Sequence, residues 1–219
     1  MISIEQQNNL FMSISKRMKR KITAYAIGGT AMMFHGLKDA TLDIDLVFMS
    51  HSDRTVFEEA AVSLGYVKMD SIDVYGDRSN KPEMVKLGES RLDLFLPKVM
   101  NTIFSEEMVK RAANSHAFSD KLTIKIADPG DILIMKCATE RIKDRDDVKR
   151  MSEITSLNWD AIVSEAKNQI ALGNSVMAME LGCFLEEMNN KLGMDVPKKV
   201  LDELFGVVEK QSREKRKKA

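Results

Sequence analysis

The amino-acid sequence predicts an α/β domain followed by a helical domain, and three observations lead to this prediction. Short apolar segments typical of strands are interleaved with segments of helical periodicity as far as about residue 127. A turn at Asp128-Pro129-Gly130 follows. Beyond this turn the periodicity is helical and is interrupted at glycine and proline. We therefore expect an α/β domain over residues 1–127 and a helical C-terminal domain over residues 128–219.

The expected elements follow from local patterns, taken in chain order. A helix over residues 4–21 is predicted because its apolar residues can share one face, and a strand over residues 25–27 ends at Gly28-Gly29. Thr30 is expected to N-cap a short helix that ends near Gly36. Further strands are expected over residues 42–49, 66–69, 84–87, 91–96 and 122–126. Further helices are expected over residues 54–64, 101–113, 132–143 and 145–154, then from Trp159 to a frayed, charged tail, with interruptions at residues 173–174, Gly193 and Pro197.

The composition is that of an ordinary soluble globular protein of 219 residues, with 44% hydrophobic and 30% charged residues and a formal net charge of zero. This balance argues against a chain built as a whole to bind polyanions, although a local basic patch stays possible. No apolar run reaches the roughly 20 residues that span a bilayer, and the N-terminus lacks the pattern of a signal peptide. Cys137 and Cys183 are expected to be buried, reduced thiols, which suits a cytoplasmic protein without membrane partners.

The segment LDIDLVF places two acids within an apolar strand. Because successive side chains of a strand point to opposite faces, Asp43 and Asp45 should share one face, and Leu42, Ile44 and Leu46 should face the core. Two carboxylates held this close raise each other's pKa, and a divalent cation would remove the repulsion. Ligation by oxygen alone is typical of Mg²⁺ or Mn²⁺.

A third acid and a glycine pair extend this pattern. Asp93 lies within RLDLFL, a second strand-like run, and could complete a set of three carboxylates that binds one or two metal ions. Gly28 and Gly29 stand between a strand and the start of a helix, where a backbone without Cβ atoms can approach a phosphate, with Thr30 as a hydroxyl donor. Each signal alone is also typical of an ordinary turn or an exposed sheet edge, so the prediction depends on the combination.

The combination of Gly28-Gly29, Asp43-x-Asp45 and Asp93 resembles the signature of the nucleotidyltransferase fold, the DNA polymerase β-like superfamily. The segment from Gly28 to Phe48 is similar to uncharacterised archaeal and bacterial nucleotidyltransferases and to nucleotidyltransferase toxins of the AbiE type. The segment MKCATERIKDRDD, with Lys136, Lys143 and further charged residues, extends the resemblance. One departure is Asp39, where many relatives carry an arginine; Lys38 stands beside it.

The resemblance implies a mixed sheet flanked by helices over residues 1–127 and a definite reaction. Such enzymes transfer a nucleoside monophosphate from a nucleoside triphosphate to a hydroxyl and release pyrophosphate. Asp43, Asp45 and Asp93 would be catalytic and would bind Mg²⁺ or Mn²⁺. Nucleotide-binding residues would be Gly28, Gly29, Thr30, Lys136 and Lys143. For the two lysines, a solvated helix face is the alternative interpretation.

The sequence leaves three hypotheses open. The chain could be a nucleotidyltransferase acting on RNA, such as a tRNA, or on a protein hydroxyl, with a possible toxin or phage-defence role. It could instead be a catalytically silent module that binds a nucleotide or a partner. In the third hypothesis, the C-terminal helices carry the function by binding a second copy or an antitoxin-like protein.

Overall fold

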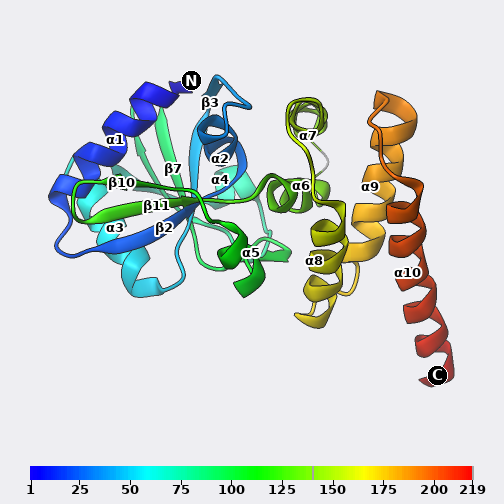
Figure 1. Ribbon diagram of the computed structural model, residues 1–219. Coiled ribbons are helices and arrows are strands. Elements are labelled where there is room, and N and C mark those ends of the chain that lie inside the picture. The colour runs from blue at the N-terminus through cyan, green and yellow to red at the C-terminus, as the bar shows by residue number, and fades with distance from the viewer. Residues whose placement is uncertain (140, 219) are drawn as a thin grey trace. The chain divides into compact units, whose positions relative to one another are not determined.

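The computed structural model describes residues 1–139 and 141–218 of the chain. The chain divides into two compact units, Met1–Asp128 and Pro129–Ala219 (Figure 1). The first unit combines a sheet with helices, and the second is helical throughout the residues that the structure describes. The predicted fold class, mixed α/β with a helical C-terminal region, is therefore confirmed.

The N-terminal unit is built on a mixed sheet of seven strands, counted over the described residues. In spatial order these are β10 (Ser115–Phe118), β11 (Leu122–Ile126), β2 (Ile22–Ala26), β4 (Asp43–Val47), β7 (Ser90–Phe95), β6 (Glu83–Leu87) and β5 (Val67–Met69). At the centre, β4 pairs antiparallel with β2 and parallel with β7. Two short ladders accompany the sheet, β1 (Ile2–Ser3) with β3 (Ala40–Thr41) and β8 (Lys98–Val99) with β9 (Thr102–Ile103).

Three of the helices described in the N-terminal unit begin at a serine that caps them through its side chain. The helices described there are α1 (Ile4–Arg17), α2 (Gly28–Phe34), α3 (His51–Val62), α4 (Ile72–Tyr75) and α5 (Glu106–Arg111). Ser3 forms a capping box with Gln6 at the start of α1, and Ser50 and Ser105 cap α3 and α5 through their hydroxyls. Helix α3 packs against β2, β6, β7 and α1. The central strands are thereby covered, and Ile44 and Leu46 are completely buried.

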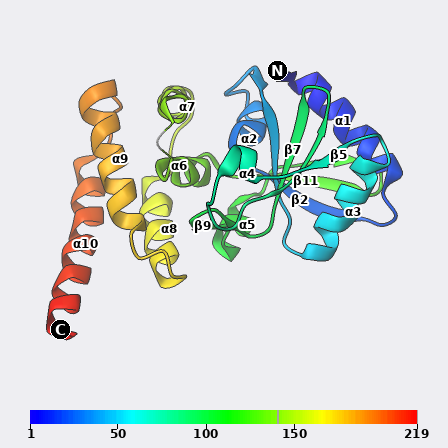
Figure 2. The same ribbon diagram turned by 180° about the vertical axis from the view of Figure 1, so that it is seen from behind.

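The C-terminal unit consists of helices α6 (Pro129–Cys137), α7 (Ile142–Ile154), α8 (Trp159–Ala171), α9 (Met177–Leu192) and α10 (Lys198–Lys218). Helices α8, α9 and α10 pack against one another, and α9 and α10 run side by side (Figure 2). Helix α9 ends at Gly193, whose φ of 63° provides the left-handed conformation of a C-terminal cap. Within the described residues, no helix combines the length and the apolar character needed to cross a membrane.

Several local predictions need correction. The helix expected over residues 101–113 starts only at Glu106, because Thr102–Ile103 form β9. Strand β10 and the short strands β1 and β3 were not predicted. The C-terminal helix continues to Lys218, where a frayed tail was expected. The missed strands have only two to four residues, which is too short for the alternation of apolar and polar side chains to identify a strand.

Predicted side-chain environments also differ at two positions. Leu42 precedes β4 and is 60% exposed, so the apolar face of the strand begins with Ile44. Of the two free thiols, Cys137 is buried as expected, whereas Cys183 lies on an exposed position of α9.

Candidate active site

Strands β4 and β7 bring the three predicted acids to one face of the sheet. Their parallel register places Asp43 opposite Arg91 and Asp45 opposite Asp93. Residues two apart on a strand share a face, and so do residues paired across neighbouring strands. The face of the central strands therefore carries Asp43, Asp45, Asp93 and, among them, Arg91.

The guanidinium of Arg91 joins two of the three carboxylates. Its Nη2 forms an ion pair with Oδ2 of Asp43. Its Nε lies 2.9 Å from Oδ1 of Asp93, and its Nη2 lies 3.0 Å from Oδ2 of the same residue. This two-point contact is the geometry in which arginine binds a carboxylate most strongly. Arg91 thus offsets part of the repulsion between Asp43 and Asp93.

Tyr75 completes the environment of Asp93. Its hydroxyl donates a hydrogen bond of 2.6 Å to Oδ2 of Asp93 from helix α4, which lies in the connection between β5 and β6. The side chain of Asp93 has no exposure to solvent, whereas those of Asp43 and Arg91 are 16% and 23% exposed. The deepest acid thus accepts hydrogen bonds from protein groups at both of its oxygens, and Asp43 is nearer to the surface.

Burial and neighbouring charges shift the titration of this cluster. Burial raises the pKa of Asp93, while Tyr75 and Arg91 oppose the rise and the charge of Asp43 adds to it. Burial and the negative charges of Asp45 and Asp93 raise the pKa of Tyr75 far above its ordinary value, so Tyr75 is a hydrogen-bond donor at neutral pH. For Arg91, burial opposes the charged form, but Asp93 and Asp43 outweigh it and raise the pKa.

The glycine pair lies against the same acids. Gly28 opens α2 with a φ of 54°, and a Cβ atom there would lie 2.8 Å from Oδ2 of Asp45. A Cβ atom on Gly29 would lie 2.5 Å from Oγ1 of Thr41. Real Cβ atoms avoid such contacts, so a side chain at Gly28 would have to move the carboxylate of Asp45 in β4, and one at Gly29 would have to move Thr41 in β3. The positive φ of Gly28 favours glycine there in addition. Gly28 thus lies directly against Asp45, whereas Gly29 lies against Thr41.

Thr30 does not act as the predicted N-cap. Helix α2 is preceded by Ile27 and has no side-chain cap, and Thr30 is a completely buried residue within the helix. Its Oγ1 accepts a hydrogen bond of 2.8 Å from the backbone N–H of Asp45. Thr30 therefore fixes the start of α2 to the strand that carries Asp43 and Asp45, which is a positioning role that local pattern analysis did not identify.

The donor chemistry of this face suits a divalent cation, but Arg91 and Tyr75 already contact the carboxylates that would bind it. Three carboxylates are ligands that Mg²⁺ and Mn²⁺ prefer. However, Arg91 and Tyr75 hold the oxygens of Asp43 and Asp93 that a metal ion would use. Across residues 1–139 and 141–218, no group of three or more His, Cys, Asp or Glu side chains is arranged to hold a metal ion. Metal binding by Asp43, Asp45 and Asp93 stays a prediction.

Lys136 and Lys143 belong to the C-terminal unit, where Lys136 is part of a buried ion-pair network. Its Nζ lies 2.5 Å from Oδ1 of Asp144 and 2.8 Å from Oδ2 of Asp147. Lys143 is exposed, and the extent of the helix expected over residues 132–143 is wrong, because α6 ends at Cys137 and α7 begins at Ile142. Lys136 is therefore paired with Asp144 and Asp147, and the two lysines lie in different helices.

Asp144 is the centre of that network. It also accepts hydrogen bonds from Oγ1 of Thr139, at 2.6 Å, and from Nε of Arg141, at 2.7 Å. Burial acts to raise the pKa of Asp144, but the charge and hydrogen bond of Lys136, with help from Thr139 and Arg141, lower it to about 2. This aspartate is therefore ionised and fully paired at neutral pH.

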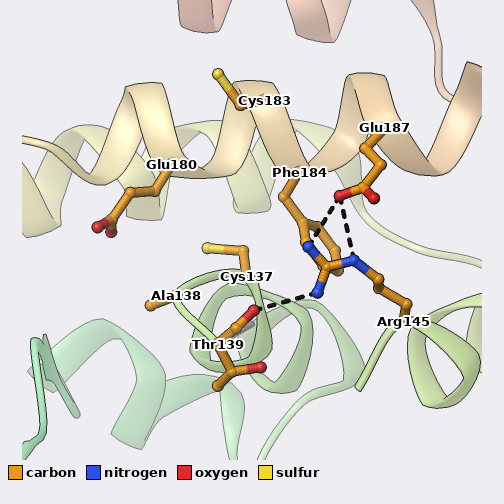
Figure 3. A pocket seen from close by; sticks show the side chains of 8 residues that line it. All are labelled: Cys137, Ala138, Thr139, Arg145, Glu180, Cys183, Phe184 and Glu187. Atoms are coloured by element: carbon orange, nitrogen blue, oxygen red, sulfur yellow. Dashed lines mark hydrogen bonds and ion pairs between the residues drawn. The ribbon is translucent and has the colours of Figure 1, made fainter. Parts of the chain in front are cut away.

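A small pocket of about 240 Å³ also lies within the C-terminal unit (Figure 3). Arg145 lies over the ring of Phe184 and binds Oε2 of Glu187 through Nε and Nη2, at 3.1 and 2.9 Å. Cys137 and Glu180 line the same pocket, and burial raises the pKa of both. Arg145 also donates to the backbone carbonyl of Thr139, at 3.3 Å, so its guanidinium is held by groups that line the same pocket.

Comparisons with known proteins were made for the whole chain. No family model matches it, and no curated protein matches it. Among solved structures, it is similar to the crystal structure of ANT(2″)-Ia in complex with adenylyl-2″-tobramycin. The TM-score is 0.43 and the sequence identity is 13%, with 83% of this chain and 98% of that chain covered. A likeness at this level carries no inference about substrate or activity.

Proposed function

We propose that the chain is a nucleotidyltransferase that moves a nucleoside monophosphate from a nucleoside triphosphate to a hydroxyl of an RNA, such as a tRNA, or of a protein. The observation that carries the proposal is the convergence of Asp43, Asp45 and Asp93 on one sheet face, with Gly28 packed against Asp45. The order of these elements along the chain, glycine pair, Asp-x-Asp and later Asp, is the signature that the sequence resembles.

Charge balance at this face indicates what a nucleotide needs in order to bind there. The three carboxylates repel a triphosphate, and Arg91 supplies only one compensating positive charge among these four residues. Additional cations are therefore required, and Mg²⁺ or Mn²⁺ is the chemical class that carboxylates and phosphates share as ligands. The proposal accordingly includes a divalent cation as cofactor, with Gly28, Gly29 and Thr30 bordering the nucleotide.

The proposal predicts a strict dependence of nucleotide transfer on Asp45. Each of the four α-labelled nucleoside triphosphates is incubated with the protein and cell extract, with Mg²⁺, Mn²⁺ or a chelator. Wild-type protein should label an RNA or a protein only with metal present. Asp45→Asn should reduce labelling by about 100-fold or more, the scale on which loss of a catalytic group acts.

The matched control is Asp53→Asn, because Asp53 lies in the same unit but pairs with Arg20 at the start of α3. This variant should label as well as the wild type. Absence of transfer by the wild type with every nucleotide and metal, or equal transfer by Asp45→Asn, would contradict the proposal.

A second candidate function is a catalytically silent module that binds a nucleotide or a partner. The contacts of buried Asp93 with Arg91 and Tyr75 favour it, because both oxygens of this acid already have partners within the protein. Metal-dependent nucleotide binding without transfer to any RNA or protein would select this alternative. A toxin or phage-defence role, an antitoxin-like partner and a cytoplasmic location stay predictions that rest on the sequence.

A further inference from the structure

We propose that Arg91 is a built-in cation that competes with a divalent metal ion for the oxygens of Asp43 and Asp93, so that metal binds tightly only together with an anionic ligand. The anionic ligand of matching chemistry is the phosphate chain of a nucleotide. This coupling rests on the proposed function for its substrate class, whereas the competition between Arg91 and a metal ion rests on the geometry alone.

The competition follows from the atoms that Arg91 already uses. Its Nη2 contacts Oδ2 of Asp43 and lies 3.0 Å from Oδ2 of Asp93, and its Nε contacts Oδ1 of Asp93. A metal ion bridging Asp43 and Asp93 would need an oxygen of Asp93, and Arg91 contacts both of them. Because a divalent cation and a guanidinium repel each other at such distances, the two compete for these oxygens. Entry of a metal ion should therefore displace Arg91.

Displacement leaves Arg91 in need of a new partner. Only 23% of its side chain is exposed, so the freed charge would stay partly buried beside a divalent ion. An unpaired charge in such a position is strongly unfavourable. A phosphate group matches the fork of donors on a guanidinium as well as a carboxylate does, and it also binds the metal ion. Metal and nucleotide should therefore strengthen each other's binding through Arg91.

Tyr75 adds a second and weaker restraint on Asp93. Its hydroxyl reaches Oδ2 of Asp93 at 2.6 Å from α4, a helix of four residues outside the sheet. Removing this hydroxyl frees one lone pair of Asp93 and leaves the charges of the cluster unchanged. Tyr75→Phe should therefore ease metal binding in the same direction as a change at Arg91, but by a smaller factor.

The test measures Mn²⁺ binding to the full-length chain by isothermal titration calorimetry, with and without a non-hydrolysable nucleoside triphosphate analogue. Arg91→Met should bind Mn²⁺ alone at least tenfold more tightly than the wild type. In the wild type, the analogue should tighten Mn²⁺ binding at least tenfold, and this gain should shrink in Arg91→Met. Arg145→Met is the matched control, because Arg145 has a similar exposure of 22% and an acidic partner, Glu187. It should bind Mn²⁺ as the wild type does.

Circular dichroism would reveal whether Arg91→Met misfolds. In that case Arg91→Lys and Tyr75→Phe test the same inference. A lysine keeps the charge but loses the two-point contact, so Arg91→Lys should give an intermediate gain in Mn²⁺ affinity. Mn²⁺ affinities equal to the wild type in all folded variants, or no Mn²⁺ binding by any of them, would overturn the inference. If labelled transfer occurs but the affinities are equal, the proposed function stands and this inference fails. If transfer is absent but Arg91→Met gains tenfold, the competition stands and the proposed function fails.

Discussion

Two charged clusters, one in each unit, use the same types of side chain but differ in their charge balance. We call them the strand cluster (Asp43, Asp45, Asp93 and Arg91) and the helix cluster (Lys136, Arg141, Asp144 and Asp147). The strand cluster has three acids and one base, whereas the helix cluster has two of each. Both contain a completely buried aspartate, Asp93 in one and Asp144 in the other.

Because of this difference, the strand cluster can accept a further cation, whereas the helix cluster is already balanced. In the helix cluster the opposite charges cancel, and the low pKa of Asp144 shows that its ionised form is well stabilised. In the strand cluster an excess of negative charge remains, and burial raises the pKa of Asp93. A balanced cluster contributes to stability, and an unbalanced one has residual affinity for a positive ligand.

The largest effect should come from breaking the balance of the helix cluster. Lys136→Met removes the buried positive partner of the completely buried Asp144 and leaves it only the exposed Arg141 in that role, so it should lower the free energy of unfolding by about 3–5 kcal/mol. Urea titration measures this loss. Lys149→Met is the control, because Lys149 pairs with Glu153 at the surface and should cost less than about 1 kcal/mol. Equal losses in the two variants would show that the helix cluster is not a stabilising network.

A smaller effect should appear at the glycine that touches the strand cluster. Gly28 and Gly88 have φ values of 54° and 56°, so alanine at either position should cost about 1–2 kcal/mol of backbone strain. A Cβ atom at Gly88 meets nothing within 4 Å, whereas at Gly28 it meets the carboxylate of Asp45. Gly28→Ala should therefore lose more stability in urea than Gly88→Ala, and it alone should lose nucleotide transfer. If the two variants lose the same stability and keep the same nucleotide transfer, the contact with Asp45 does not explain why position 28 is a glycine.

The smallest effect concerns the pH dependence of stability. The pKa of Asp144 is lowered to about 2 in the folded chain, so the unfolded chain takes up the proton first as the pH falls. The stabilisation is thus fully present above the ordinary aspartate pKa of about 4 and is lost as the pH falls through about 2. Unfolding midpoints measured from pH 5 to pH 2 should fall more steeply for the wild type than for Asp144→Asn. Asp120→Asn, at an exposed turn, should follow the wild-type slope.

Strand alternation was enough to predict which acids share a face, because the alternation of acidic and apolar residues in LDIDL and RLDLF can be read from each segment alone. The same alternation also places Arg91 beside Asp93, and this signal in the sequence was not used. Tyr75 had no comparable signal, because it reaches Asp93 across 18 residues from a connection whose path depends on tertiary structure. The partner of a buried acid can therefore come from a segment that no periodicity identifies.

The break between α6 and α7 shows a second limit of local patterns. The segment MKCATERIKDRDD contains no glycine or proline, so the helix was expected to continue past Lys136. Instead, the side chains of Thr139 and Arg141 bond to Asp144, and the N–H of Asp144 donates to the carbonyl of Arg141. Such side-chain contacts compete with helix continuation, and they depend on the burial of Asp144 and Lys136. Burial of this kind is a property of the folded unit.

The parallel register of β4 and β7 has a consequence for how the chain tolerates insertions and deletions. One residue gained or lost between Thr41 and Asp43 would turn both acids to the covered side and bring Ile44 and Leu46 to the polar side. The same change in the stretch from Gly76 to Pro82 would leave the parity of every central strand intact. Variation in chain length should thus accumulate in that connection, while the spacing inside the ladder stays fixed.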